Sequence, residues 1–365
     1  PPFLLQKWRN KNKYIIGFFS LFDKANQEKN WRSRRKISRK NSDIQIHLTF
    51  DKKETKIKLV FWQEFSHAGQ NIAQDHDTME ENHMAFQYDI PFQVDLSDRV
   101  ALVTGGNGGI GGMFCRALAA CGATVIVLGR NLERCQKVAD EINAGGGKAD
   151  AISGDVTDEA AMLRVKDEIA KKYGGLNILI NAAGGAVKSA MVPQDQMADP
   201  SDKTFFDVPA ADIQKEFDLN MRGTWLPSKV LTPLMIGQTG ACVLNVSSMS
   251  AFIPLTRIPG YSGAKAGVSS FTQWLATYLA RSGIRVNAIA PGFFMTEQNH
   301  ALQFNPDGTP TPRCEHIVNG TPMKRYGELK ELIGAMLFLV DERAASFVTG
   351  VVLPVDGGFS AYSGV

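Results

Sequence analysis

The sequence predicts an α/β fold, in which a parallel sheet of seven strands is doubly wound, with helices on both faces. Short runs rich in β-branched residues alternate with longer stretches of helical periodicity from Arg99 onward. Several runs, such as Val125–Leu128 and Ile178–Ile180, are apolar throughout, as strands buried on both faces require. Because no repeat or linker interrupts this pattern, we predict a single domain over residues 84–365.

The seven predicted strands are separated by stretches long enough for crossover helices. They cover residues 99–105, 124–129, 148–153, 176–181, 241–248, 284–292 and 351–358. Residues 186–209 are less regular and predict a surface insertion ahead of a helix around residues 213–221. Residues 293–327 contain four prolines, and we predict that they form a lid, because long loops in compact domains are usually functional.

The first 83 residues differ from the rest in charge. They carry 16 Lys and Arg against 10 Asp and Glu, whereas residues 84–365 carry 24 against 27. We interpret residues 1–83 as a non-native or disordered leader from an over-extended reading frame, with Met84 as the true start. The purine-rich codons that Met79–Glu81 requires favour this reading, since they resemble a ribosome-binding site. The alternative is a basic arm around residues 31–40 that binds nucleic acid.

Composition excludes disorder for the chain as a whole, because 44% of its residues are hydrophobic and 9% are aromatic. The five cysteines form no C-x-x-C pair, which favours a cytoplasmic protein without disulfides or zinc. The six histidines lack ligand spacing, so we expect no metal. The apolar run at residues 14–22 is too short for a membrane span of roughly 20 residues, and we expect no membrane or nucleic-acid partner.

A glycine-rich stretch, residues 104–111, follows the first predicted strand and opens a helix. Gly105 permits a tight turn. Gly109 and Gly111 have no side chain, so nothing at these positions blocks the approach of a phosphate or the close packing of the helix. The helix N-terminus attracts the anion. The stretch therefore predicts a Rossmann-type dinucleotide site, with a purely structural turn as the alternative.

The residues after the second and third strands bear on the cofactor. Gly129 and Arg130 stand where an acidic residue would bind the ribose hydroxyls of NAD, and Arg130 can pair with a 2′-phosphate. We therefore predict NADP(H) over NAD(H), with a solvated Arg130 as the alternative. Asp155 could accept the adenine amino group and Val156 could pack on the ring, unless Asp155 only caps a helix.

Tyr261 and Lys265 stand four residues apart in a helical stretch, so that the phenol and the ammonium share one face. A nearby ammonium lowers the pKa of a tyrosine, which is about 10 when unperturbed, toward a range useful for acid–base catalysis. Ser248 ends a predicted strand 13 residues before Tyr261, where its hydroxyl could bond a reacting oxygen. The alternatives are a chance pair on an exposed face and a serine that merely ends a strand.

Taken together, these motifs resemble the short-chain dehydrogenase/reductase family. The glycine-rich stretch, Asn181–Gly184 (NAAG), Asn220, Ser248 with the Y-x-x-x-K pair, and Pro291–Thr296 (PGFFMT) occur in that family's order and spacing. The resemblance runs roughly from Leu96 to the C-terminus. The usual NNAG is NAAG here, which keeps the small residues needed beside the cofactor.

The resemblance implies a role for each matching residue. Tyr261 exchanges the proton, Ser248 orients the reacting oxygen, and Lys265 binds the nicotinamide ribose and lowers the pKa of Tyr261. Asn220 holds a water in a proton relay, and Thr296 contacts the carboxamide. It also implies a homotetramer, or a dimer. The residues expected to line the cofactor site are Gly105, Asn107, Gly109, Ile110, Gly111, Arg130, Asp155, Val156, Asn181, Ala182, Gly184, Tyr261, Lys265, Pro291, Gly292 and Thr296.

Within that family the chain resembles the group assigned to D-mannonate and D-fructuronate, which implies a sugar-acid substrate. Such a substrate needs a cation for its carboxylate, and Arg257 is our first candidate. Gln298, Asn299 and Arg313 in the predicted lid are further candidates. The alternatives are reduction of a gluconate-type keto acid or a 3-oxoacyl substrate, and a non-catalytic cofactor-binding sensor.

Overall fold

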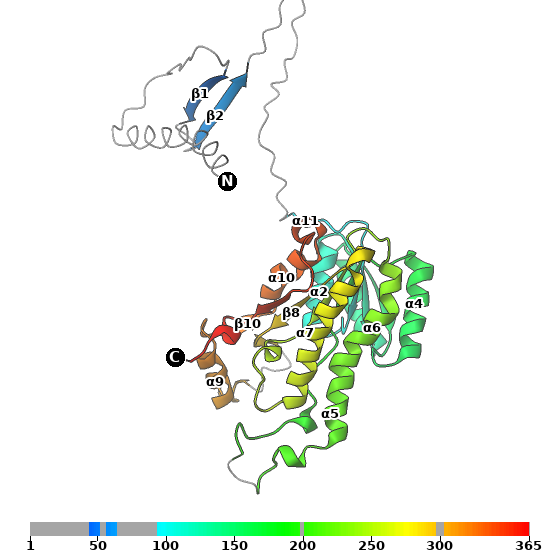
Figure 1. Ribbon diagram of the computed structural model, residues 1–365, viewed down its shortest axis with the longest axis vertical. Helices are drawn as coiled ribbons and strands as arrows, with labels where there is room; N and C mark the ends of the chain where they lie inside the picture. The colour runs from blue at the N-terminus through cyan, green and yellow to red at the C-terminus, as the bar shows by residue number, and fades with distance from the viewer. Residues whose placement is uncertain (1–43, 52–55, 64–92, 198–200, 297–302, 365) are drawn as a thin grey trace, which may run out of the picture. The chain divides into compact units, whose positions relative to one another are not determined.

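The computed structural model describes residues 44–51, 56–63, 93–197, 201–296 and 303–364. The chain divides into two compact units, residues 1–85 and residues 86–365. In the first unit, β1 (Ile44–Asp51) and β2 (Lys56–Gln63) form an antiparallel pair, labelled in Figure 1. The interpretation of residues 1–83 as a leader stays a prediction.

The second unit is built on one seven-stranded sheet. Its strands are β3 (Val100–Thr104), β4 (Thr124–Gly129), β5 (Lys148–Ser153), β6 (Ile178–Asn181), β7 (Cys242–Val246), β8 (Arg285–Pro291) and β11 (Val352–Val355). They lie in the order β11, β8, β7, β6, β3, β4, β5, and every neighbouring pair is parallel. All seven predicted strands and the doubly wound fold are therefore confirmed.

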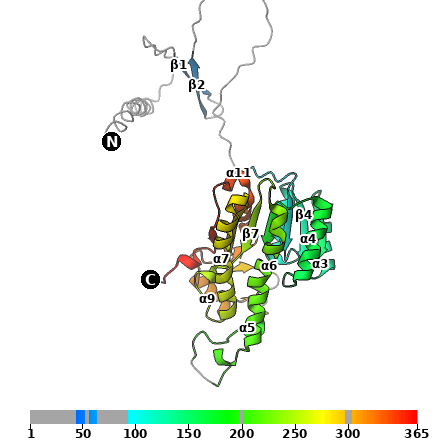
Figure 2. The ribbon, with the colours of Figure 1, turned by 45° about the vertical axis from the view of Figure 1, so that its right-hand side comes forward.

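Helices cover both faces of this sheet. Helices α2 (Gly109–Ala120), α3 (Leu132–Ala144) and α10 (Glu331–Val340) share one apolar core with the first face. Helices α4 (Glu159–Tyr173), α6 (Gly223–Leu231) and α7 (Pro259–Leu279) share a second core with the other face, and Figure 2 shows them in front of the sheet. The short helix α11 (Glu342–Ala345) follows α10.

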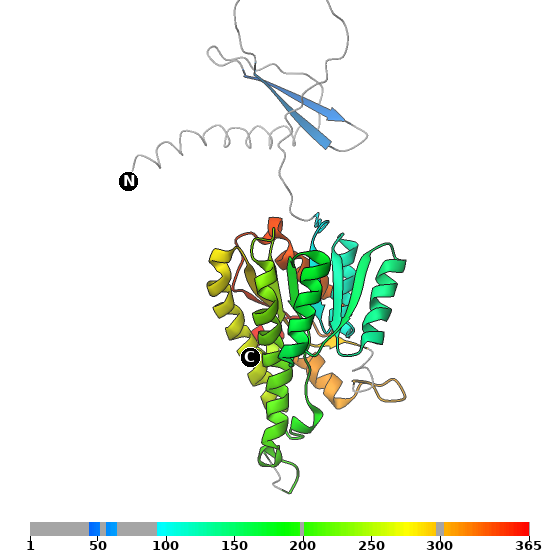
Figure 3. The ribbon, with the colours of Figure 1, turned by 90° about the vertical axis from the view of Figure 1, so that its right-hand side faces the viewer.

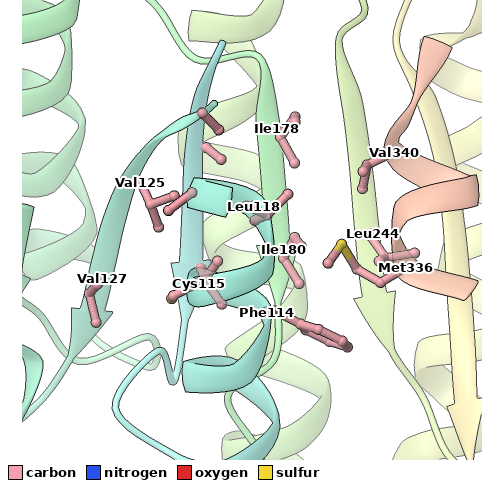
Figure 4. Close-up of a cluster of buried hydrophobic side chains, with 14 of the residues drawn as sticks. Phe114, Cys115, Leu118, Val125, Val127, Ile178, Ile180, Leu244, Met336 and Val340 are labelled. Carbon is pink, nitrogen blue, oxygen red and sulfur yellow. The ribbon is translucent and has the colours of Figure 1, made fainter. Parts of the chain in front are cut away.

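The apolar strands supply both cores because alternate side chains point to opposite faces. On the α2 side, the side chains of α2, the central strands and α10 gather in one cluster, shown in Figure 4 with Phe114, Ile180 and Met336 among its members. Each fully buried side chain of this size stabilises the fold by about 1.5–3 kcal/mol. The continuous apolar runs thus fix the sheet between two helical layers.

The carboxyl ends of the central strands meet at one edge of the sheet. Thr104 of β3 lies opposite Asn181 of β6, which in turn lies opposite Asn245 of β7. The strand order reverses between β3 and β6, since β4 follows β3 on one side and β7 follows β6 on the other. Ligands of doubly wound sheets bind at this reversal.

Two segments of irregular sequence extend from the same edge. The first holds the short helices η1 (Lys188–Ala190) and η2 (Phe205–Asp207) and leads into α5 (Ala210–Phe217), which projects beyond the sheet in Figure 3. The second contains α9 (Pro312–Gly320) and a parallel pair of short strands, β9 (Phe294–Met295) and β10 (Gly327–Glu328). The predicted lid is therefore partly regular structure.

Candidate active site

The glycine-rich turn joins β3 to α2. Gly105 has a φ of 64°, a left-handed conformation that glycine adopts without strain. A Cβ on Gly111 would lie less than 3.0 Å from the Gly105 carbonyl oxygen, closer than real Cβ atoms come, so only glycine fits there. A Cβ on Gly109 would meet no atom closer than 3.7 Å. Gly111 therefore serves packing, whereas the space at Gly109 is open.

The N-terminus of α2 is suited to an anion. Its N-cap, Gly108, has no side-chain capping hydrogen bond, and the first turn holds no acidic residue. Ile110 is half-buried and packs against the apolar core. Thr296 lies close by, because the nearest atoms to a Cβ on Gly109 are Leu329 Cδ1 and Thr296 Cγ2, the latter at 3.8 Å.

The end of β6 is tied to the end of β3 by a single hydroxyl. Thr104 Oγ1 accepts hydrogen bonds from the backbone N–H of Ala182 at 3.0 Å and of Ala183 at 3.1 Å. A Cβ on Gly105 would lie 2.9 Å from the Cα of Ala183, so the turn and the NAAG segment touch. This contact forms the floor of the predicted cofactor site.

The structure gives the Asn181 side chain a structural environment. It is buried, and its amide nitrogen donates to Ser228 Oγ at 2.9 Å and to Asn245 Oδ1 at 2.8 Å. Asn245 donates in turn to Thr272 Oγ1. These contacts link β6, β7, α6 and α7 beneath the site, so the side chain of Asn181 faces the interior.

The residues predicted for the adenosine half lie at the ends of β4 and β5. Asn107 covers Gly129, where a Cβ would lie 2.5 Å from Asn107 Oδ1. Arg130 is exposed, and its carbonyl accepts a hydrogen bond from Ser153 Oγ. Arg130 is therefore a solvent-exposed residue just after the end of β4.

Asp155 and Val156 follow β5. Burial acts to raise the pKa of Asp155, but two hydrogen bonds from Thr157 and the charges of Arg130 and Arg222 outweigh it and lower the pKa. Val156 is buried, with its Cγ2 2.9 Å from the Cβ position of Gly223. Asp155 is therefore an ionised residue near Arg130, and part of its hydrogen-bonding capacity is used in a local turn.

Ser248, Tyr261 and Lys265 come together above the ends of β6 and β7. Ser248 caps a short helix, η5 (Met249–Ala251), and its Oγ accepts from the Ser250 backbone at 3.1 Å. Lys265 is buried, and its Nζ donates to the Val246 carbonyl at 2.7 Å and lies 5.7 Å from the Tyr261 ring centroid. A Cβ on Gly184 would lie 3.1 Å from Lys265 Nζ, so the NAAG segment adjoins the lysine.

Burial controls the ionisation of this group. Burial raises the pKa of Tyr261, a hydrogen bond with Ser248 partly offsets the rise, and the Glu216 carboxylate adds to it. Burial lowers the pKa of Lys265 to about 8. Desolvation of the phenol therefore dominates the pKa of Tyr261 in this structure, and the role of Lys265 in lowering that pKa stays a prediction.

Asn220 lies in a π-helical turn, η3 (Asp218–Arg222), between α5 and α6. Its side chain accepts from the Gly185 N–H at 3.0 Å and donates to the Gly185 and Glu216 carbonyls, both at 2.9 Å. Its own carbonyl accepts from Thr224 Oγ1 at 2.8 Å. π-Helical turns are frequent at functional sites. The side chain of Asn220 therefore positions the segment after β6.

The remaining cofactor candidates lie after β8. Pro291 ends that strand and is buried. Gly292 donates to the Val355 carbonyl at 2.9 Å, and a Cβ there would lie 2.6 Å from Asp356 Cβ. Since Thr296 lies beside the glycine-rich turn, residues 291–296 run from β8 toward α2.

The candidate substrate residues divide into two sets. Arg257 is half-exposed, and its Nε lies 3.4 Å from the Val192 carbonyl and 3.9 Å from Asp195 Oδ1. It therefore links the segment before Tyr261 to the insertion at residues 186–209. Gln298 and Asn299 lie outside the described residues, and Arg313 is exposed in α9.

Sequence reasoning missed two residues of this site. The sequence identifies Thr104 only as the start of the glycine-rich stretch. Its role becomes visible in the hydrogen bonds that its hydroxyl accepts from the segment after β6. Glu216 lies one helical turn before Asn220 and is fully buried. The four-residue spacing between Glu216 and Asn220 could have indicated that this carboxylate lies on the same helix face as the predicted active-site asparagine.

The described residues contain no group of three or more His, Cys, Asp or Glu side chains that could hold a metal ion. In the same residues, no helix has the length and apolar character needed to cross a membrane.

Comparison with known proteins agrees with this geometry. A family model described as short chain dehydrogenase matches residues 99–306. An uncharacterised oxidoreductase of Haemophilus influenzae is 46% identical over 285 residues, which cover 77% of this chain and 100% of that protein. The residues matched by the family model contain every strand of the seven-stranded sheet except β11, and they include Ser248, Tyr261 and Lys265.

Solved structures share the fold. A Haemophilus influenzae crystal structure with bound NAD, provisionally described as a D-mannonate oxidoreductase, is 47% identical with a TM-score of 0.72, covering 74% of this chain and 98% of that chain. A gluconate 5-dehydrogenase of Burkholderia cenocepacia, in complex with NADP and tartrate, is 29% identical with a TM-score of 0.64 and covers 74% and 99%. Both cofactors thus occur among its structural neighbours.

Proposed function

The chain belongs to the short-chain dehydrogenase family, an oxidoreductase family that acts on CH–OH groups, and from this premise we propose a sugar-acid oxidoreductase. The proposed reaction interconverts a ketone and a secondary alcohol, with D-fructuronate and D-mannonate as the pair. The observation that carries the proposal is the placement of Tyr261 one helical turn from the buried Lys265, whose Nζ lies 5.7 Å from the Tyr261 ring centroid. The provisional description of the Haemophilus structure supports the substrate class.

The residues present fit a nicotinamide dinucleotide. The uncapped N-terminus of α2 and the open space at Gly109 suit a pyrophosphate. Small residues at Ala182 and Gly184 keep side chains away from the surface above β6. Bound there, the cofactor supplies or accepts the hydride, and every other step falls to residues of the chain.

We assign the proton to Tyr261. In reduction its hydroxyl donates a proton to the ketone oxygen, and in oxidation it accepts one from the alcohol. Ser248, already hydrogen-bonded to the phenol, orients that same oxygen. Lys265 is held against β7 through the Val246 carbonyl, which directs its ammonium toward Gly184. We propose that Lys265 binds the ribose and that the Asn220 carbonyl holds a relay water.

Cofactor choice depends on Arg130 in this proposal. An exposed guanidinium at the end of β4, where NAD-selective sites carry an acid, favours the 2′-phosphate of NADP(H). Arg130→Ala should raise the Kd for NADPH about 10- to 100-fold and change that for NADH less than about threefold. Titration of cofactor fluorescence measures both. Equal losses for the two cofactors, or tighter wild-type binding of NADH, would contradict the NADP(H) assignment.

Substrate choice depends on Arg257 in this proposal. Its Nε is near Val192 and Asp195, which leaves the outer edge of the guanidinium for a substrate carboxylate. Arg257→Ala should raise the KM for D-fructuronate about tenfold or more, while kcat falls less. Arg281→Ala serves as the matched control, because Arg281 is an exposed arginine in the short helix η6 (Ala280–Ser282), which follows α7. An unchanged KM would favour a ketone without a carboxylate, such as a 3-oxoacyl substrate.

We also propose that the chain forms a homotetramer in the cytoplasm. Trp274 and Tyr278 of α7 stack at 5.1 Å yet remain 57% and 69% exposed, and Trp225 of α6 is 41% exposed. Exposed aromatic faces of this kind mark interaction surfaces. Light scattering counts the copies directly, and a monomer would contradict the proposal.

A further inference from the structure

The carboxylate of Glu216 is buried beside the proposed catalytic tyrosine, and the roles assigned above do not use it. Its side chain is fully inaccessible, and Oε1 accepts a hydrogen bond from the Val187 N–H at 2.8 Å. Oε2 is one of four buried side-chain polar atoms without a hydrogen-bond partner in the described part of the chain. Because a buried carboxylate is costly, its presence calls for a function.

Oε2 faces the start of α7. A Cβ on Gly260 would lie less than 3.0 Å from Oε2 and 3.0 Å from Ile213 Cδ1, so only a glycine allows this approach. The N-cap of α7, Ile258, provides no side-chain cap, and the first turn of the helix has no acidic residue. Glu216 therefore supplies, from α5, the negative group that the N-terminus of α7 lacks.

The second oxygen of the Glu216 carboxylate, Oε1, contacts the segment after β6. Val187 is bonded to Glu216, and Gly185 is bonded to Asn220, one turn further along the same helical segment. This segment leads out of NAAG, whereas α7 carries Tyr261 in its first turn. Glu216 thus joins the floor of the cofactor site to the helix that carries the proton-exchanging group.

We propose that Glu216 is a positioning residue that caps α7 from α5 and sets the place and charge environment of Tyr261. The inference rests on the proposed role of Tyr261. A carboxylate at Glu216 disfavours a phenolate at Tyr261.

Four elements near this pair carry other charged groups. From α7 there is Lys265, whose Nζ donates to the Val246 carbonyl. From η3 there are Asp218 and Arg222, whose side chains lie 3.9 Å apart. From η1 there is Lys188, which is exposed. On α5 itself, Lys215 is paired with Asp212 at 2.8 Å. Among these side chains Glu216 is the acid in direct reach of Tyr261, so its neutralisation has a defined electrostatic effect.

Glu216→Gln tests this inference, because it keeps the shape and removes the charge. In the oxidation direction, activity rises with pH as Tyr261 loses its proton. Removing the nearby negative charge favours the phenolate, so the midpoint of that rise should move down by about half a pH unit or more. Loss of the negative charge at the N-terminus of α7 should also lower kcat about 10-fold, with the cofactor Kd unchanged within about twofold.

Asp218→Asn is the matched control, since it removes a half-exposed carboxylate two residues away, 3.9 Å from Arg222. It should leave both kcat and the midpoint unchanged. An unchanged midpoint in Glu216→Gln, with or without lower kcat, would overturn the inference. Should Tyr261→Phe retain full turnover, the proposed function fails instead, and the two failures are distinct.

A second variant reaches the contact from the other side. Gly260→Ala keeps the carboxylate but places a methyl group where Oε2 now lies. We expect kcat to fall at least about fivefold, while the cofactor Kd changes less than about twofold. Wild-type kcat in Gly260→Ala would overturn the inference even if Glu216→Gln did not fold.

Discussion

Tyr261→Phe should lower turnover about 10²- to 10⁴-fold, the range that a positioned acid or base contributes. The substitution removes one oxygen and leaves the ring, which Lys265 Nζ approaches to 5.7 Å from the centroid. Cofactor binding should persist, because the glycine-rich turn and the NAAG segment are untouched. The assay follows absorbance of the reduced nicotinamide with D-fructuronate and either NADPH or NADH, on protein beginning at Met84.

Tyr278→Phe is the matched control for that assay. Tyr278 lies on the same helix, stacks on Trp274, and is 69% exposed, so loss of its hydroxyl should leave turnover unchanged. Turnover retained in Tyr261→Phe would remove the tyrosine from the mechanism. A wild-type protein that binds cofactor but turns over neither mixture would instead refute the substrate, and other keto acids and ketones would follow.

The ionisation of Tyr261 shows how far sequence reasoning reaches. The four-residue spacing correctly predicted that Tyr261 and Lys265 share a helix face, because helix periodicity is local. It did not predict the sign of the pKa shift, which depends on burial and on Glu216, a residue 45 positions earlier. Lys265 is itself desolvated, which lowers its pKa to about 8 and weakens its hold on a proton.

Other features of the site were also predictable where they depend on neighbouring residues and not where they depend on distant ones. The strands and the glycine-rich turn were predictable, since apolar runs and glycines encode them within a few residues. The contacts of Thr104 with Ala182 and of Arg257 with Asp195 were not, because they join segments far apart in the chain. The hydrogen bonds from the Asn181 side chain to Ser228 and Asn245 were not predictable either, because they depend on the packing of α6 on β6 and β7.

Substitution of Gly111 should affect stability, whereas substitution of Gly109 should affect cofactor binding. In Gly111→Ala the new methyl group would lie less than 3.0 Å from the backbone oxygen of Gly105, which cannot move as a side chain can. We expect a loss of about 3 kcal/mol in the free energy of unfolding, and a Tm lower by roughly 5–10 °C. Thermal unfolding without cofactor measures this loss directly.

Gly109→Ala is the complementary variant, because its methyl group would find no atom closer than 3.7 Å in the structure. Its Tm without cofactor should therefore stay within about 2 °C of wild type, since alanine also favours a helix start over glycine. The methyl group instead occupies space reserved for pyrophosphate, so cofactor Kd should rise about 10- to 100-fold. If Gly109→Ala bound cofactor as wild type does, the phosphate would have to lie elsewhere than at the N-terminus of α2.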